Sequence, residues 1–171
     1  LEQYPEAVSA FDRTIAIIPD HAMAWYHKGL SLEHIRNDED AADAFEHARM
    51  TEPDNPAILL SLGKARSRLG QFEMAIRVYD HALTLQPTNG EFLLEKGIAL
   101  AHLERHEEAE VVLGQSTERL PDRFEPPFLR GLSLMLTGRY DDAVHSFDKA
   151  LALNETDPDI WYHKAISLAH L

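Results

Sequence analysis

The stretch at residues 138–153, GRYDDAVHSFDKALAL, has a close copy 68 residues earlier, GQFEMAIRVYDHALTL at residues 70–85. Weaker copies lie between these two and before them, so the sequence repeats every 34 residues. The alanine at the centre of the stretch marks this period without an insertion, as Ala7, Ala41, Ala75, Ala109 and Ala143. A constant period of this length is typical of a repeat architecture.

Four more positions keep the same register when the repeats are numbered from residues 22, 56, 90, 124 and 158. Position 4 is Trp25, Leu59, Leu93, Pro127 and Trp161. Position 8 is Gly29, Gly63, Gly97, Gly131 and Ala165. Position 24, counted also in the partial repeat before residue 22, is Phe11, Phe45, Tyr79, Leu113 and Phe147. Position 32 is Pro19, Pro53, Pro87, Pro121 and Glu155.

The apolar residues within a repeat follow a helical period. Ala75, Ile76, Tyr79, Ala82 and Leu83 place one stripe on a 3.6-residue turn. Glycine separates the two halves of a repeat at 70 and 138, and proline stands in the first turn of several predicted helices. The pattern predicts helices at 4–18, 22–35, 39–52, 56–69, 72–85, 90–103, 106–119, 126–137, 140–153 and 158–170. The prolines at 126 and 127 should distort or delay the start of their helix.

The small residues predict close contact between the two helices of a repeat. A glycine inside a helix costs about 0.5–1 kcal/mol relative to alanine, so four of them at one position need a structural reason. We expect Gly29 to face Ala41, Gly63 to face Ala75 and Gly97 to face Ala109, which lets the helix backbones approach.

The pattern W-x2-L-G-x2-Y, A-x3-F and P on a 34-residue period resembles the tetratricopeptide repeat. The resemblance implies an all-α, right-handed α-solenoid (superhelix) of 34-residue helix-turn-helix repeats over the whole chain. It predicts a second helix of a partial repeat at 1–21, full repeats at 22–55, 56–89, 90–123 and 124–157, and a first helix of a partial repeat at 158–171. The Leu column of the family departs from the pattern, because it holds Lys28, Lys96, Arg130 and Lys164 beside Leu62.

These basic residues have acidic counterparts at position 25 of the preceding repeat. We expect ion pairs between neighbouring helices, worth at most about 1 kcal/mol each when exposed. The predicted pairs are Asp12–Lys28, Asp80–Lys96 and Asp148–Lys164.

Composition limits the classes of partner. A net charge of -13 argues against nucleic acid and against anionic membranes. The chain has no cysteine and no apolar run of about the 20 residues that span a bilayer, and we expect a cytoplasmic protein. It starts at Leu1 in the middle of a repeat, which suggests that the natural protein is longer.

Signatures of catalysis and of cofactor binding are missing from the sequence. The patterns G-x-x-x-x-G-K-[ST], G-x-G-x-x-G, G-x-S-x-G and H-E-x-x-H do not occur. The ten histidines include His27 with His34, and His163 with His170, each seven residues apart. That separation is about 10 Å along a helix, too far for one metal ion, so we expect surface and groove histidines. We therefore expect no enzyme, no cofactor and no metal site.

The resemblance also implies a binding surface, because in this family the first helices line a concave groove for extended or helical peptides. Carried over position by position, the groove here is mostly apolar, and Lys64 and Arg68 offer local recognition of an anionic group. The predicted groove residues are Tyr26, His27, Leu30, Leu60, Lys64, Arg68, Leu94, Ile98, Phe128, Leu132, Met135, Tyr162 and Ile166.

The expected function is that of a protein–protein interaction scaffold that binds a peptide or a partner segment in this groove. One alternative is the substrate-docking or regulatory arm of a larger enzyme whose catalytic domain lies outside this sequence. A second alternative is a self-assembling structural solenoid. Head-to-tail association through the incomplete terminal repeats would support that alternative, since Trp161 and Leu168 at one end and Phe11 and Ile15 at the other would otherwise lack cover.

Overall fold

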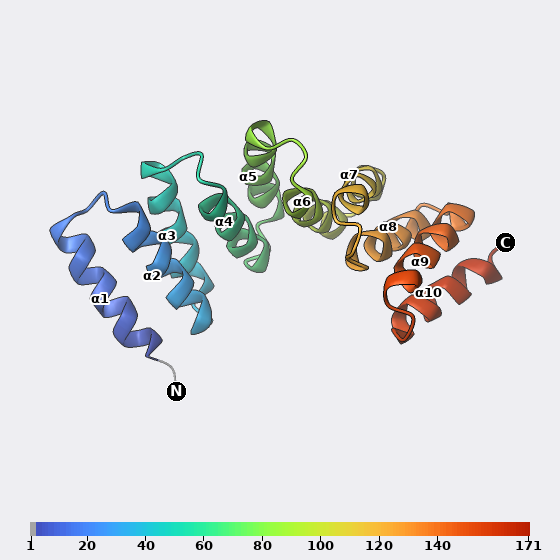
Figure 1. The fold of residues 1–171 in the computed structure, drawn as a ribbon, viewed down its shortest axis with the longest axis horizontal. Coiled ribbons are helices and arrows are strands. Elements are labelled where there is room, and N and C mark those ends of the chain that lie inside the picture. The colour runs from blue at the N-terminus through green and yellow to red at the C-terminus, as the bar shows by residue number, and fades with distance from the viewer. Residues whose placement is uncertain (1–2) are drawn as a thin grey trace. The chain divides into compact units, whose positions relative to one another are not determined.

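The computed structural model describes residues 3–171, and this part of the chain forms ten α-helices and no strand (Figure 1). The helices are α1 (Tyr4–Ile17), α2 (Ala22–His34), α3 (Asp38–Thr51), α4 (Pro56–Arg68), α5 (Phe72–Leu85), α6 (Gly90–His102), α7 (His106–Arg119), α8 (Glu125–Leu136), α9 (Tyr140–Leu153) and α10 (Pro158–Ala169). Every helix begins and ends within one residue of its predicted range, so the helix prediction is confirmed.

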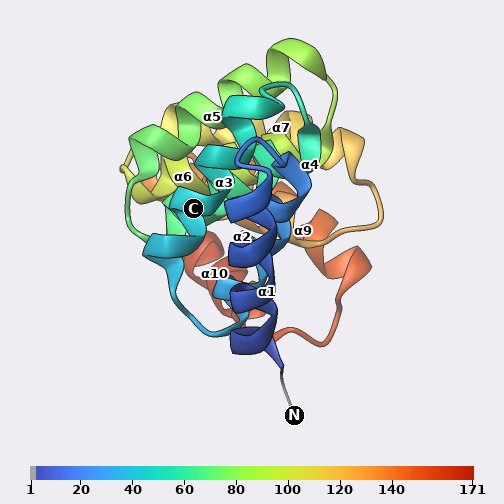
Figure 2. The same cartoon turned by 90° about the vertical axis from the view of Figure 1, so that its left-hand side faces the viewer.

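The helices form two compact units, Leu1–Leu85 and Gln86–Leu171. In the first unit each helix packs against the next one along the chain, and α2 also contacts α4. Figure 2 looks onto the start of this series, with α1 next to α2. The second unit repeats the pattern, with α6 in contact with α8 and α8 with α10. Stacking from each helix to its chain neighbours is that of an α-solenoid, so the predicted fold class is confirmed within each unit.

One residue in the left-handed region sets the turn inside each full repeat. Its φ angle is 59° at Arg36, 71° at Gly70, 58° at Glu104 and 75° at Gly138. The N–H of the next residue then bonds back to the last turn of the first helix, as from Gln71 to the Arg66 carbonyl at 2.9 Å. Glycine adopts this φ without strain, and the repeat keeps the same turn where arginine or glutamate replaces it.

The residue before each first helix controls where that helix begins. The Asn55 side-chain oxygen accepts hydrogen bonds from two N–H groups of the first turn, at 3.0 and 3.5 Å, and Asn89 and Asp157 cap their helices through the side chain too. The corresponding residue before α8 is Arg123, which is bonded to two glutamates instead. As predicted from the prolines at 126 and 127, α8 begins one residue later in its repeat than the other first helices.

A large side chain lies over the position-8 glycine of every full repeat. At Gly29 the nearest atoms to an added Cβ belong to the Phe45 ring, the closest at 2.5 Å, and at Gly131 the Phe147 ring is equally close. The glycine therefore makes room for a large side chain, and the close approach of Gly29 to Ala41 stays a prediction. The same place is taken by Tyr79 over Gly63 and by Leu113 over Gly97.

Two of the predicted ion pairs form. Lys28 Nζ lies 2.7 Å from Asp12, and Lys164 Nζ lies 2.6 Å from Asp148. Each ammonium also lies 5.1 Å from the centre of a tryptophan ring of its own helix. The third predicted pair, Asp80–Lys96, joins residues of different units and stays a prediction.

Where a repeat lacks the basic residue of position 7 or the acidic residue of position 25, the remaining charged residue pairs with another partner. Glu46 has Leu62 at the position of its basic counterpart and pairs instead with Arg49 at 2.5 Å, one turn along α3. The hydrogen bond from Arg49 holds the pKa of Glu46 below its ordinary value. Arg130 has Gly114 at the position of its acidic counterpart and lies 3.6 Å from Glu110. The basic residues of position 7 and the acidic residues of position 25 are therefore better explained as structural ion pairs than as parts of a binding site.

Candidate functional site

The predicted groove residues all lie on first helices, namely α2, α4, α6, α8 and α10. Most of their side chains are half-buried or exposed, which is the condition for contact with a partner. Tyr162 is the most open of the apolar ones, with 63% of its surface exposed. Two members of the set, Leu94 and Arg68, have surroundings that differ from the expectation.

Leu94 is a packed residue, since only 2% of its surface is exposed. Phe92 and Leu93, beside it on α6, are also buried. The burial of Leu94 argues against direct contact with a partner, which its repeat position had predicted. Ile98, one turn further along α6, is half-buried and remains a candidate contact residue.

The Arg68 side chain is held by two carboxylates. Its Nε donates to Asp38 at 2.7 Å, and its Nη2 donates to Glu33. Burial favours the neutral form of Arg68, but the hydrogen bonds to Asp38 and Glu33 outweigh that effect and raise the pKa of this guanidinium. Because two carboxylates already balance its charge, the geometry argues against anion recognition by Arg68, and anion recognition by Lys64 stays a prediction.

We call the contact between the second helix of one repeat and the first helix of the next a seam. At a seam the residue at position 17 of one repeat lies near the residue at position 13 of the following repeat. At the α1–α2 seam the Tyr4 ring stacks on His34 with 4.2 Å between ring centres. A hollow of about 530 Å³ lies there, and its walls are largely polar and aromatic. The hollow is lined by Gln3, Tyr4, Ala7, Phe11, His27, Leu30, Ser31 and His34, which include two predicted groove residues.

Two other seams are joined by a specific pair of side chains. At the α3–α4 seam the pair is Asp38 with Arg68. At the α9–α10 seam the rings of Tyr140 and His170 meet edge to face, with 4.6 Å between their centres. Both pairs link neighbouring repeats through groups that the repeat pattern itself does not specify.

The α7–α8 seam brings together His106 and Leu136 and encloses a smaller hollow, which we call the seam pocket. Its volume is about 240 Å³, and side chains of α6, α7 and α8 form its walls. The walls are apolar apart from two histidines and one serine. The seam pocket is lined by Ile98, Ala101, His102, His106, Leu129, Leu132, Ser133 and Leu136, which again include two predicted groove residues.

Several histidines have aromatic neighbours. His27 lies against Phe11 and His163 against Phe147, with ring centres 6.0 and 6.3 Å apart, and His47 stacks on Trp25 at 4.3 Å. Within residues 3–171 no group of three or more His, Asp or Glu side chains is arranged to hold a metal ion. The same residues contain no helix long and apolar enough to cross a membrane.

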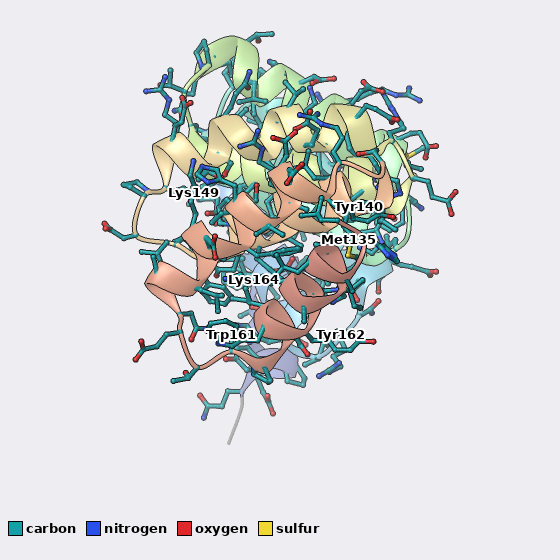
Figure 3. All side chains as sticks on the ribbon, turned by 90° about the vertical axis from the view of Figure 1, so that its right-hand side faces the viewer. Met135, Tyr140, Lys149, Trp161, Tyr162 and Lys164 are labelled. Carbon is teal, nitrogen blue, oxygen red and sulfur yellow. The ribbon has the colours of Figure 1, made fainter. Side chains whose placement is uncertain are left out.

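Helix α10 carries exposed aromatic side chains. Figure 3 looks onto this helix, from which Trp161, Tyr162 and Lys164 project. Trp161 donates its indole N–H to the Glu155 carbonyl at 2.8 Å, as Trp25 does to a carbonyl six residues before it. Trp25 is stacked on a histidine of α3, whereas 51% of the Trp161 surface is exposed.

Comparisons with known proteins agree with this architecture. The family model of the tetratricopeptide repeat matches residues 1–56 and 60–120, and a second tetratricopeptide repeat model matches residues 128–157. A search of the curated proteins gives no match.

Three solved structures illustrate the similarity of fold. YrrB, a TPR protein with an unusual peptide-binding site, has a TM-score of 0.86 at 21% identity over 95% of this chain and 84% of its own. MamA has a TM-score of 0.84 at 19% identity, over 90% of this chain and 84% of its own. PilW, a type IV pilus biogenesis factor, has a TM-score of 0.81 at 23% identity, over 98% and 79%. On the family models, which cover most of its length, the chain belongs to the tetratricopeptide repeat family.

Proposed function

We propose that the chain is a protein–protein interaction module that binds a segment of a partner protein with the exposed side chains of its first helices. The observation that carries this proposal is the position of the two hollows. Each lies at a seam between repeats, and each is lined by predicted groove residues, His27 and Leu30 in one and Ile98 and Leu132 in the other. The similarity to YrrB, a TPR protein with a peptide-binding site, supports the same kind of activity.

Site-specific photo-crosslinking tests where a partner binds. A photoreactive amino acid is placed on first helices, at His27 or Tyr162, and on second helices, at Met50 or Val111. All four positions are exposed, so accessibility is matched. We expect adducts with the same partner from the first-helix positions only. Equal yields from both sets, or adducts from the second-helix positions alone, would reject the first-helix surface.

Self-association is a second candidate, favoured by the exposed surface of α10. In a head-to-tail contact, α1 of a second copy would pack on α10 as α3 packs on α2. One residue works against this geometry. Position 8 of α10 is Ala165, and in the full repeats an added Cβ at this position lies 2.3–2.6 Å from the residue at position 24. Phe11 of the second copy would stand at that place, so the contact requires the ring or the helix to move.

A further inference from the structure

The residues that meet at the α7–α8 seam, where the seam pocket lies, differ in kind from those at the other described seams. Where the other seams within a unit carry a ring pair or an ion pair, this one pairs His106 with the aliphatic side chain of Leu136, which is 62% exposed. The α1–α2 hollow is larger, and its walls mix apolar groups with polar and aromatic ones such as Tyr4, His27 and His34. Among these seams the α7–α8 one therefore offers the most apolar recess.

The size of the seam pocket limits its ligand. Its volume of about 240 Å³ is below the roughly 300–1,000 Å³ of pockets for drug-sized molecules. Walls from three helices border the space, so a side chain inserted there would lose part of its contact with water. The volume and the apolar walls together suit one large apolar side chain.

Among the described residues, two glutamates without an ion-pair partner lie next to lining residues of the seam pocket in the sequence. The turn between α6 and α7, both of which line the pocket, carries Glu104, and Glu107 follows at the start of α7; both are exposed. Within residues 3–171 neither of them forms an ion pair. Arg105 in the same turn is bound to Glu108 by two hydrogen bonds of 2.7 Å, which compensates its charge. The field at this site therefore favours a cationic partner, in a chain of net charge -13.

From these observations we infer that the seam pocket receives one leucine- to phenylalanine-sized side chain of a partner polypeptide, and that lysine or arginine stands next to that side chain. The inference rests on the proposed function and adds to it the location in the second unit and the chemistry of the bound segment. The apolar side chain supplies affinity by leaving water, and the basic neighbour supplies selectivity through Glu104 and Glu107.

Selection from a phage library of random peptides on the intact chain tests the inference. We expect the enriched peptides to share a large apolar residue with a lysine or arginine beside it. Two variants then probe the seam pocket: Leu136→Lys, which adds a cation at an exposed wall residue, and Ala101→Leu, which fills the space. Val111→Lys is the matched control, because Val111 is 55% exposed in the same unit and the charge change is identical.

The enriched peptides should bind both pocket variants at least about tenfold more weakly than the unmodified chain, since burial of the apolar side chain is lost. Their affinity for Val111→Lys should stay unchanged, and thermal melting shows that each variant is folded. Peptides that bind Leu136→Lys and Ala101→Leu normally but fail on His27→Glu would overturn the inference and leave the proposed function standing. Enrichment of acidic peptides, or of none, would also overturn it, while the crosslinking pattern decides the proposed function separately.

Discussion

Replacing Gly131 by alanine adds a single methyl group directly under the Phe147 ring. The added Cβ would lie 2.5, 2.7 and 2.9 Å from three carbons of that ring, all closer than real Cβ contacts allow. Phe147 is fully buried, so the ring has no route into water and the two helices must separate instead. Overpacking of this kind typically costs about 1–3 kcal/mol.

A second effect opposes the clash. Alanine is a better helix former than glycine by about 0.5–1 kcal/mol, so with the middle of both ranges the expected net loss of unfolding free energy for Gly131→Ala is roughly 1 kcal/mol. Gly114 provides the matched control within the same unit. The nearest atom to its added Cβ is the Arg130 Nε at 3.3 Å, a tight contact that the flexible Arg130 side chain relieves by moving a few tenths of an ångström. Gly114→Ala should therefore stabilise the chain by about 0.5–1 kcal/mol.

Urea unfolding followed by circular dichroism measures both variants. The opposite signs are the diagnostic result, because helix propensity alone predicts stabilisation in both cases. In a Phe147→Ala background the clash disappears, and Gly131→Ala should become stabilising there. If Gly131→Ala proves as stable as the unmodified chain while the ring is present, the account of glycine as space for the ring is refuted.

Three further predictions follow from the packing and the charges. Ala109 is fully buried, so Ala109→Leu should reduce the unfolding free energy by about 1–3 kcal/mol; an unchanged melting temperature would contradict the close packing of the helices. Because Arg49 lowers the pKa of Glu46, the contribution of Glu46 is present above its ordinary pKa and is lost as the pH falls through the lowered one. The stability advantage over Glu46→Gln should accordingly shrink between about pH 5 and pH 3, whereas a constant difference would show that the ion pair is not linked to folding. Ala165→Gly removes the methyl group that would meet Phe11 of a second copy, and should strengthen head-to-tail association in sedimentation experiments; identical sedimentation of both forms would count against that contact.

The repeat period made the helices predictable to within one residue, because every repeat carries the same apolar stripe and the same punctuation. Structural features that occur in one repeat alone were harder to predict from the sequence. The late start of α8 follows from its prolines and from Arg123, which stands where an asparagine or aspartate caps α4, α6 and α10. The turns at Arg36 and Glu104 have the geometry of the glycine turns, and only the repeat alignment points to them.

The sequence predicted which repeat positions could form the candidate surface, but it did not predict which of their side chains are exposed. Leu94 shares its repeat position with Phe128 and Tyr162, but it is buried together with Phe92 and Leu93, and the periodicity does not show which copies of a repeat position are covered. Arg68 looked like an open cation because Glu33 and Asp38 belong to other helices. The side-chain pairs at the seams were not predicted, although the sequence places an aspartate opposite an arginine, and tyrosines opposite histidines, at positions 17 and 13.

The differences between the seams have a consequence for folding. Helices built to one pattern can pair with the wrong copy, and misassembly of neighbouring repeats is a characteristic failure of repeat proteins. A slip by one full repeat would set Tyr4 against the guanidinium of Arg68 and leave Asp38 without its partner. The ion pair at the α3–α4 seam thus favours the correct neighbour, so a contact that the repeat pattern does not specify helps to keep the repeats in order.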